Sequence, residues 1–401
     1  MTAVALPVDL TSAATFADGH PWEAYRWLRD NSPVAWHPMD EQPGFWVLSR
    51  YDDVKAVSRQ PKLYSSYEGG IMMETPDPDQ LAAQRFMMLS MDPPDHDRFK
   101  QLVMRGFTPK GVATMTERVQ ALAKEIIDDI IDKRECDFVA DIAGRLPSGL
   151  IAELMGIPRA DGERLYELTE IMHTTDPLIA PPEKKMAAIG EMLGYAATVA
   201  QAKRLNPGND IGSLLVQAEV DGERLTDNEF QWFFLLLVNA GGDTTRNLMA
   251  AGLQLLFDNP DQRARLMADI DGLLPTAIEE MLRYTTPVIY FRRTLLADVT
   301  LRDAEMKAGD KIVMLYGSAN RDGDVFESPD AFDVGRNPNP HLAFGGGGPH
   351  LCLGLHVARL EIDALWRQIL TRLPNIAPNG PVELMASNFI AGVHSMPVRF
   401  E

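Results

Sequence analysis

The segment Phe344-Gly345-Gly346-Gly347-Gly348-Pro349-His350-Leu351-Cys352-Leu353-Gly354 is the most informative part of this chain, because it places a cysteine in a glycine-rich loop before an amphipathic helix. Four consecutive glycines open backbone conformations closed to other residues and let a large flat ligand lie directly on the main chain. The helix that follows points its N-terminal amides towards the cysteine, which favours an anionic sulfur. The loop therefore predicts a shielded thiolate, with Cys352 as the candidate metal ligand.

Two other interpretations of this loop exist. A glycine run before a helix can hold phosphate, but such a loop ends in Lys-Ser or Lys-Thr, whereas this one continues as His350-Leu351-Cys352. A phosphate site is therefore disfavoured. Taken alone, the loop fits a buried structural cysteine beside a flexible turn equally well.

The composition is that of a large globular protein. Of the 401 residues, 45% are hydrophobic, and proline and glycine are spread along the chain without a linker, a low-complexity tract or a tandem repeat. Helical patterns run with only short interruptions. We therefore expect one mainly α domain spanning residues 1–401, with a small β-rich region.

Charge and cysteine content restrict the partners and the location. Acidic residues number 57 against 38 Lys and Arg, and the net charge of -19 argues against nucleic acid and anionic membranes as general partners. The chain has two cysteines, and its start lacks the basic and long apolar regions of a signal peptide. We expect a reducing cytoplasmic location, no membrane anchor, and a structural role for Cys136.

Apolar patterns predict the first elements of the chain. A short helix is expected over residues 22–28 and a strand over 45–49, as part of a small sheet. Residues 68–91 predict a mobile loop whose methionines either adapt to a ligand or tuck onto the core. Between residues 163 and 206, two helices should flank an irregular segment at 175–182, because its prolines exclude a continuous helix.

A long buried helix is predicted from Thr226 to Asn259, since Thr226 and Glu229 have the spacing of a capping box and a proline follows Asn259. Its centre, Ala240-Gly241-Gly242-Asp243-Thr244-Thr245, is weak, because each interior glycine costs about 1 kcal/mol relative to alanine. An acid beside an alcohol supplies what a proton relay needs. Close helix packing at the glycines, with Thr244 bonding back to the preceding turn, is an equal alternative.

A third signal is the pair Glu280 and Arg283, three residues apart on one helix face. Such pairs are common on solvated surfaces and mean little alone. This pair is informative because of the order of the motifs along the chain. The glycine-interrupted helix comes first, then this pair and a strand-like stretch at 288–294, and then residues 332–336 and the cysteine loop.

Together these motifs resemble the cytochrome P450 family of haem-thiolate monooxygenases over nearly the whole chain. The resemblance implies the cytochrome P450 fold, with haem b between the long central helix and the helix after the cysteine loop. It implies that Cys352 is the axial iron ligand. It also implies a buried ionic triad of Glu280, Arg283 and Arg336 that supports the cysteine loop.

The resemblance assigns further residues to oxygen and to haem. Asp243 and Thr244 match the acid and alcohol that deliver protons to oxygen. The basic residues that hold the haem propionates correspond to His96, Arg293 and His350. Other residues expected to contact the cofactor are Lys100, Ala240, Phe344 and Gly354.

Two features depart from the commonest family pattern. The loop has one additional residue between Phe344 and Cys352, which puts in question the usual stacking of Phe344 over the thiolate. Lys100 stands where many relatives carry arginine. Either Lys100 or Arg98 is therefore expected to reach a propionate.

An apolar substrate pocket is implied in the same way. Its expected lining is Met72, Met73, Met87, Met88, Leu236, Asn239, Val288, Ile289 and Ile390. These residues carry no charge, which indicates an apolar small molecule. Residues 290–294 and 337–344 look like those of bacterial members that oxidise methyl-branched lipids, isoprenoids and steroid side chains. We expect hydroxylation of a methyl-branched lipid or isoprenoid first, and of a terpene or steroid second.

Electrons are expected from a separate ferredoxin and ferredoxin reductase, with O2 as co-substrate, because the chain shows no fused flavin or iron-sulfur region. An acidic ferredoxin would be repelled by the overall charge, so docking requires a local basic patch. Candidates for this patch are Arg98, Arg105, Lys110 and Arg359, although each alone also fits a solvated surface residue.

Two other functions would use the same cysteine loop. A haem sensor or carrier without turnover gains nothing from a weakened central helix. A peroxide-driven haem enzyme typically lacks the helix-centre acid and alcohol. The presence of Asp243 and Thr244 therefore favours an oxygen-activating monooxygenase over both.

Overall fold

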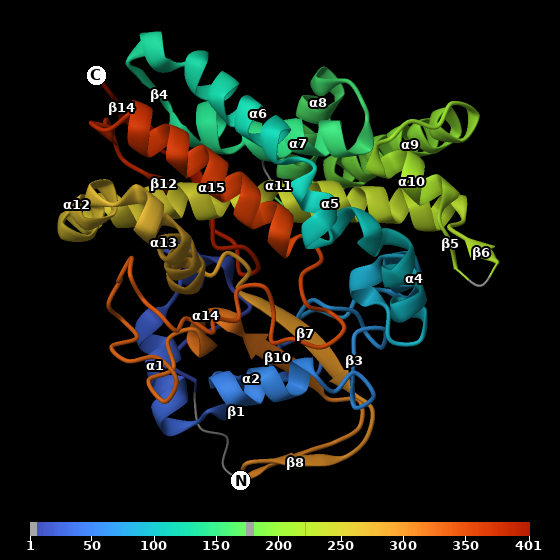
Figure 1. Cartoon of the computed structure of the whole chain (residues 1–401). Coiled ribbons are helices and arrows are strands. Elements are labelled where there is room, and N and C mark those ends of the chain that lie inside the picture. The colour runs from blue at the N-terminus through green and yellow to red at the C-terminus, as the bar shows by residue number, and fades with distance from the viewer. Residues whose placement is uncertain (1–5, 174–179, 221) are drawn as a thin grey trace. The chain divides into compact units, whose positions relative to one another are not determined.

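The computed structural model of the chain describes residues 6–173, 180–220 and 222–401 (Figure 1). The side chains of Arg105, His173 and Val220 and most of the predicted irregular segment at 175–182 lie outside this description. In total, 53% of the chain is helical and the strands form small sheets. The prediction of a mainly α fold with a small β-rich region is confirmed.

The chain forms two compact units, each assembled from segments that are distant in sequence. Unit 1 consists of the chain up to Asp97, of Glu279–Cys352 and of Met385–Ala391. Unit 2 consists of Arg98–Ile278, Leu353–Leu384 and Gly392–Glu401. The single domain spanning residues 1–401 stays a prediction.

Unit 1 is built on a five-stranded sheet with the strand order β1-β2-β10-β7-β3. Strand β10 runs parallel to β2 and antiparallel to β7. The strands are β1 (Val34–His37), β2 (Phe45–Leu48), β3 (Tyr64–Ser65), β7 (Tyr290–Leu295) and β10 (Lys311–Leu315), and a separate hairpin pairs β8 (Val299–Leu301) with β9 (Ala304–Met306). The strands predicted near 45–49 and 288–294 are confirmed.

Unit 1 also contains several short helices. They are α1 (Trp22–Asn31), α2 (Tyr51–Ser58), α3 (Pro78–Gln84) and α14 (Tyr316–Ala319), with the short 3-10 turns η1 (Ala13–Phe16) and η2 (Met88–Ser90). The helix predicted over 22–28 is confirmed as α1. Two more helices, α4 (Asp95–Val103) and α13 (Ile270–Thr285), have residues in both units.

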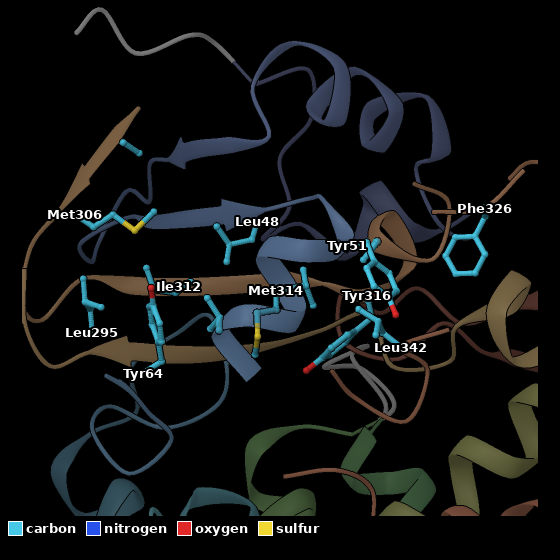
Figure 2. Close-up of a cluster of buried hydrophobic side chains, with 14 residues drawn as sticks. Leu48, Tyr51, Tyr64, Leu295, Met306, Ile312, Met314, Tyr316, Phe326 and Leu342 are labelled. Atoms are coloured by element: carbon cyan, nitrogen blue, oxygen red, sulfur yellow. The ribbon is translucent and has the colours of Figure 1, made fainter. Parts of the chain in front are cut away.

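Side-chain alternation along β10 produces two apolar clusters. Ile312 and Met314 belong to the cluster that includes residues of α2, as Figure 2 shows. Val313 and Leu315 belong to the other cluster, with residues of α1. Successive side chains of a strand point to opposite faces, and each buried aliphatic side chain contributes roughly 1.5–3 kcal/mol. The sheet is therefore held from both sides.

The predicted loop at 68–91 contains a helix, so the prediction of irregular structure throughout this segment is wrong. The Asp77 side chain accepts hydrogen bonds from the backbone N–H groups of Asp79 and Gln80, and Pro78 occupies the first turn of α3. An aspartate cap followed by proline at the first helical position starts a helix. This local signal was present in the sequence.

Unit 2 consists mainly of helices around α11 (Asp227–Asp258), the long helix in Figure 1. The other helices are α5 (Pro109–Ala113), α6 (Thr116–Asp128), α7 (Arg145–Met155), α8 (Arg159–His173), α9 (Pro182–Leu205), α10 (Ile211–Gln217), α12 (Pro260–Ala268) and α15 (Leu355–Arg372), with the shorter turns η3 (Met104–Phe107), η4 (Ile131–Lys133) and η5 (Val139–Ala143). Helix α11 packs against α7, α8 and α9, and α15 packs against α6 and α11.

Helix α11 begins as its sequence predicts. The Thr226 hydroxyl accepts from the backbone N–H of Glu229, and the Glu229 side chain accepts from the backbone N–H of Thr226. This capping box satisfies N–H groups that the first turn leaves without partners. The helix then continues through Gly241 and Gly242 without interruption.

Short strands complete unit 2. They are β4 (Glu135–Asp137), β5 (Glu219–Val220), β6 (Glu223–Arg224), β11 (Ala377–Pro378), β12 (Glu383–Leu384), β13 (Val393–Ser395) and β14 (Pro397–Arg399). Cys136 lies in β4. Burial raises the pKa of its thiol to about 12, and the nearby charges of Asp141 and Asp137 add to this effect. Across the described ranges, no helix has both the length and the apolar character needed to span a membrane.

Candidate active site

The cysteine loop is closed by its own backbone. Cys352 is exposed, and its N–H donates to the carbonyl oxygen of Phe344 at 3.0 Å. The N–H of Gly345 donates to the carbonyl of Leu342 at 2.8 Å. The ring of Phe344 lies 6.0 Å from the ring of His341, between centroids. Phe344 is thus tied to Cys352 through the main chain.

The glycines of this loop are required by its conformation. Gly345, Gly347 and Gly348 have φ values of 98°, 90° and 75°, which side chains with a Cβ rarely adopt. A Cβ at Gly346 would lie 2.5 Å from the Ser58 Oγ, and one at Gly348 would collide with the Ser58 carbonyl oxygen. The glycine run therefore lets the loop pack on the end of α2, a role that the sequence interpretation did not include.

Glu280 is the centre of a buried ionic network in unit 1. Arg283 donates from Nε and Nη2 to its two carboxylate oxygens at 2.7 and 2.8 Å. Arg336 Nε lies 3.1 Å from both oxygens, and Asn339 Nδ2 and the backbone N–H of Asp333 each donate at 3.0 Å. Glu280 and Arg283 are both 0% exposed. The network fixes residues 333–339, which precede the cysteine loop.

Three basic residues predicted to bind propionates lie in unit 1. The rings of His96 and His350 are 4.5 Å apart between centroids. His350 Nε2 lies 3.1 Å from the Ser66 Oγ, and Asp92 accepts the backbone N–H of Ser66 at 2.8 Å. The charge of Asp92 also acts on the third residue, Arg293. Sequence reasoning missed Ser66 and Asp92, which carry no motif of their own.

Arg293 is buried with few partners. It is 4% exposed, and its Nη1 donates to the carbonyl oxygen of Arg292 at 2.8 Å, the one hydrogen bond that its guanidinium makes to the described residues. Burial lowers the pKa of Arg293, an effect partly opposed by Tyr316 and Asp92. A buried cation needs acceptors, and a carboxylate ligand would supply them. Arg293 therefore fits an anionic group bound beside it.

The described part of the chain, which includes the sulfur of Cys352, holds no group of three or more His, Cys, Asp or Glu side chains placed to bind a metal ion. A metal ion held by this sulfur would therefore need its other ligands from a cofactor. A porphyrin, whose propionates are anionic, fits both this cysteine and the buried Arg293.

The predicted acid and alcohol lie in the middle of α11 in unit 2. The Thr244 hydroxyl donates to the carbonyl of Ala240 at 2.8 Å, the back-bonding expected of the packing alternative. Asp243 is 2% exposed and lies 3.4 Å from Nη2 of Arg246, which also pairs with Glu170 of α8. Burial acts to lower the pKa of Arg246, but Asp243, Tyr166 and Glu170 outweigh it and raise that pKa. Arg246 therefore stays charged.

One stripe of α11 stays accessible. Leu236 and Thr244 are partly exposed and Ala240 is exposed, whereas most of the neighbouring helix is buried. These residues are four apart and share a helix face. A Cβ at Gly241 would meet Ile151 at 3.6 Å, and one at Gly242 would meet Tyr166 at 3.4 Å, both ordinary contacts. Close packing alone therefore does not require the glycines.

Comparison with known proteins identifies the family to which the chain belongs. The family model for cytochrome P450 matches residues 183–389. A methyl-branched lipid omega-hydroxylase of Mycobacterium tuberculosis is 41% identical over 387 residues, which cover 94% of this chain and 90% of that protein. The chain belongs to the cytochrome P450 family. A steroid C26-monooxygenase of Rhodococcus jostii is 35% identical, covering 100% of this chain and 87% of its own length.

A solved structure extends the likeness to the fold. Cytochrome P450 CYP268A2 of Mycobacterium marinum, in complex with pseudoionone, superposes with a TM-score of 0.92 at 37% identity, covering 100% of this chain and 99% of its own. This cytochrome P450 is accordingly a haem-thiolate monooxygenase that uses O2 and redox partners. Membership of the family implies a haem cofactor.

The remaining predicted cofactor residues of this cytochrome P450 lie in unit 2. Lys100 is half-buried on α4, one turn after His96. Gly354 forms the N-cap of α15. Arg98, the alternative to Lys100, is ion-paired with Glu223 and Glu229. Its Nε and Nη2 are therefore paired within unit 2, whereas its buried Nη1 has no hydrogen-bond partner among the described residues.

The predicted pocket residues fall into two groups. Met73 and Ile289 are 0% exposed and pack in the core cluster beside α1, so the structure gives these two a packing role. Met72, Met87, Met88, Leu236, Asn239 and Val288 are partly exposed, and Ile390 forms a β-bridge with Val288. Arg246 and Glu170 were missed, because a helix sequence does not reveal which neighbour its charges meet.

Proposed function

We propose that this cytochrome P450 binds haem b through Cys352 and hydroxylates a methyl-branched lipid or isoprenoid. The observation that carries the haem assignment is a buried arginine, Arg293, in the unit that holds the exposed Cys352. Its guanidinium makes one hydrogen bond, and no ion pair, with the described residues. The substrate class is supported by the 41% identity to the methyl-branched lipid omega-hydroxylase.

The haem would supply an iron centre that activates O2, and the chain's residues would hold it. The Cys352 thiolate would bind the haem iron. Arg293, His350 and His96 would bind the propionates. Lys100 is preferred over Arg98 as a fourth contact, because Arg98 is paired with two glutamates. Phe344, Gly354 and Ala240 would border the ring.

Asp243 and Thr244 would manage protons on the accessible stripe of α11. The hydroxyl of Thr244 is both donor and acceptor, so it can pass a proton at Oγ1 while it stays bonded to the carbonyl of Ala240. Arg246 Nη2 lies 3.4 Å from Asp243, so the buried carboxylate has a cation beside it. Asp243 would then be the charged group of the relay and Thr244 its hydroxyl.

The apolar pocket would be lined by Met72, Met87, Met88, Leu236, Asn239, Val288 and Ile390. Methionine adapts to irregular apolar shapes, which suits a branched chain. A steroid or terpene substrate is the second candidate, favoured by the steroid C26-monooxygenase relative and by the complex of CYP268A2 with pseudoionone.

Electrons would come from a ferredoxin and its reductase in the cytoplasm. Of the proposed docking residues, Arg98 is paired with glutamates and the Arg105 side chain lies outside the described residues. Lys110 and Arg359 stay candidates for the basic patch. Their reversal to glutamate should slow reduction by ferredoxin, and unchanged reduction would remove the patch from the proposal.

The decisive experiment is spectroscopic. The reduced carbon monoxide adduct should show the strongly red-shifted band of a thiolate-ligated haem, and Cys352→Ala should abolish it. Thr244→Ala should keep that band yet divert reducing equivalents to hydrogen peroxide. Product formation with NADH and redox partners would separate an enzyme from a haem sensor or carrier, for which no turnover is expected.

A further inference from the structure

Two buried cations lie side by side on the sheet of unit 1. Arg292 of β7 is 2% exposed and Lys311 of β10 is 4% exposed, and their strands are hydrogen-bonded neighbours. Neither forms an ion pair with any carboxylate of the described residues. Taking a charge out of water is costly unless it is paired. Their placement therefore calls for an explanation.

Both cations bind the backbone of one segment. Nη1 of Arg292 donates to the carbonyls of Met72 and Glu74 at 3.3 and 3.4 Å and to Thr75 Oγ1 at 3.0 Å. Lys311 Nζ donates to the carbonyl between them, that of Met73, at 3.2 Å. Three successive carbonyl groups are thus held from the sheet.

Neutral groups complete this clamp. The backbone N–H of Met73 donates to the Tyr290 hydroxyl at 3.2 Å. Gln42 binds Thr75 twice, accepting from its N–H at 2.7 Å and donating to its carbonyl at 3.2 Å, and Lys311 donates to the same Gln42 oxygen at 3.1 Å. Residues 72–75 are therefore fixed on both N–H and carbonyl sides.

Burial disfavours the charged forms of Arg292 and Lys311, the two cations that hold residues 72–75. Burial lowers the pKa of Lys311, with a further contribution from Arg292 and opposition from Glu74, to about 8. Burial also lowers the pKa of Arg292 to about 10. Even a buried ion pair can often be replaced by apolar residues without loss of stability, and these two cations have no carboxylate partner among the described residues. Stability of the sheet therefore does not account for these two side chains.

We propose that Arg292 and Lys311 are positioning residues that fix the backbone of residues 72–75 and so make the pocket wall at Met72 discriminate branched from straight alkyl chains. Met73 is anchored in the core, and Met72, the next residue, is partly exposed. A wall whose backbone cannot shift rejects a chain of the wrong shape, whereas an adaptable wall accepts both. The inference rests on the proposed function, in which Met72 lines the pocket.

The test uses the haem-loaded protein and two probes, an iso-branched seventeen-carbon fatty acid and its straight-chain isomer. Lys311→Met removes the donor but keeps a long apolar side chain. Gln42→Ala loosens the same segment from its partly exposed side, and so stays informative if the core variant folds poorly. Lys307→Met is the matched control, because Lys307 pairs with Asp298 on the surface.

Two measurements are made on each protein. Ligand-induced spin-state titration gives the dissociation constants of the two acids, and hydrogen exchange gives the protection of the amides in residues 71–75. The parent should prefer the branched acid by about tenfold. Lys311→Met should reduce this preference at least about fivefold and speed exchange in that segment, Gln42→Ala should act in the same direction, and Lys307→Met should match the parent.

The outcomes separate this inference from the proposed function. A parent that binds neither acid contradicts the proposed substrate class and the discrimination claim with it, while exchange still reports whether the clamp holds the segment. A parent that prefers the branched acid, together with variants that keep that preference, overturns the inference and leaves the proposed function standing.

Discussion

Arg283 and Arg293 are both buried arginines of unit 1, yet their surroundings are opposite. Arg283 makes five hydrogen bonds, two to Glu280 and three to the carbonyls of Asn320, Pro329 and Ala331. The guanidinium of Arg293 makes one with the described residues, to a backbone carbonyl. Since a guanidinium carries five N–H donors, the first is satisfied by the protein and the second is not. Under the proposed function, Arg283 would serve the fold and Arg293 would serve a ligand.

The largest effect on stability is expected at Glu280, the carboxylate that pairs with Arg283. Glu280→Ala would leave Arg283 and Arg336 without their carboxylate, so the free energy of unfolding should fall by roughly 3–5 kcal/mol. Urea unfolding followed by circular dichroism measures this. Asp271→Ala, which removes the exposed partner of Arg367, is the control and should change little. A similar small change in both variants would contradict the comparison.

At Arg293 we expect a loss of haem affinity without a loss of stability. Arg293→Leu should weaken haem binding roughly 100-fold, because charge-assisted hydrogen bonds contribute about 1.5–3 kcal/mol. The haem-free protein should be as stable as the parent or more stable, since an under-bonded buried cation is removed. Haem transfer to apomyoglobin and urea unfolding of the haem-free protein give the two quantities. Loss of stability without loss of haem affinity would reverse the assignment.

A third buried charged residue, Glu361, should make the stability of the protein depend on pH. Glu361 of α15 is 5% exposed, its Oε2 has no hydrogen-bond partner among the described residues, and burial raises its pKa from 4.5 to about 8. The folded state therefore binds more protons than the unfolded state between these two pH values, and stability falls as pH rises through that window. Glu361→Gln should remove this fall and gain on the order of 2 kcal/mol above pH 8.

The measurement is the urea midpoint of parent and Glu361→Gln at several pH values from acid to alkaline. The two proteins should be close at acid pH and diverge as pH rises. Parallel pH profiles would show that a partner for Glu361 exists and that its burial carries no charge penalty.

The smallest effect is expected in the backbone of α11. Gly241→Ala should raise the free energy of unfolding by about 1 kcal/mol, because an added Cβ meets Ile151 at an ordinary 3.6 Å. Gly149→Ala in α7 is the matched control and should destabilise, since its Cβ would lie 2.8 Å from Leu122. A stabilised Gly241→Ala with reduced coupling would assign the glycine to function, and a destabilised one would assign it to packing.

Local signals in the sequence predicted much of this protein. The capping box at Thr226 and Glu229 located the start of α11, because both partners lie within one helical turn. The Asp77 cap of α3 was equally local and was overlooked in favour of the proline content around it. The spacing of Glu280 and Arg283 predicted a shared helix face, but their burial came from the structure.

What the sequence determined by itself is the family, the mainly α fold and the residue types for haem chemistry, since these follow from spacing within short segments. Only the tertiary structure decided how the charges are matched. The contacts that match these charges join residues far apart in the chain. They are Asn339 with Glu280, Glu170 with Arg246, and Lys311 with the carbonyl of Met73. Whether a buried charge is satisfied depends on acceptors brought to it by folding, and no local pattern records them.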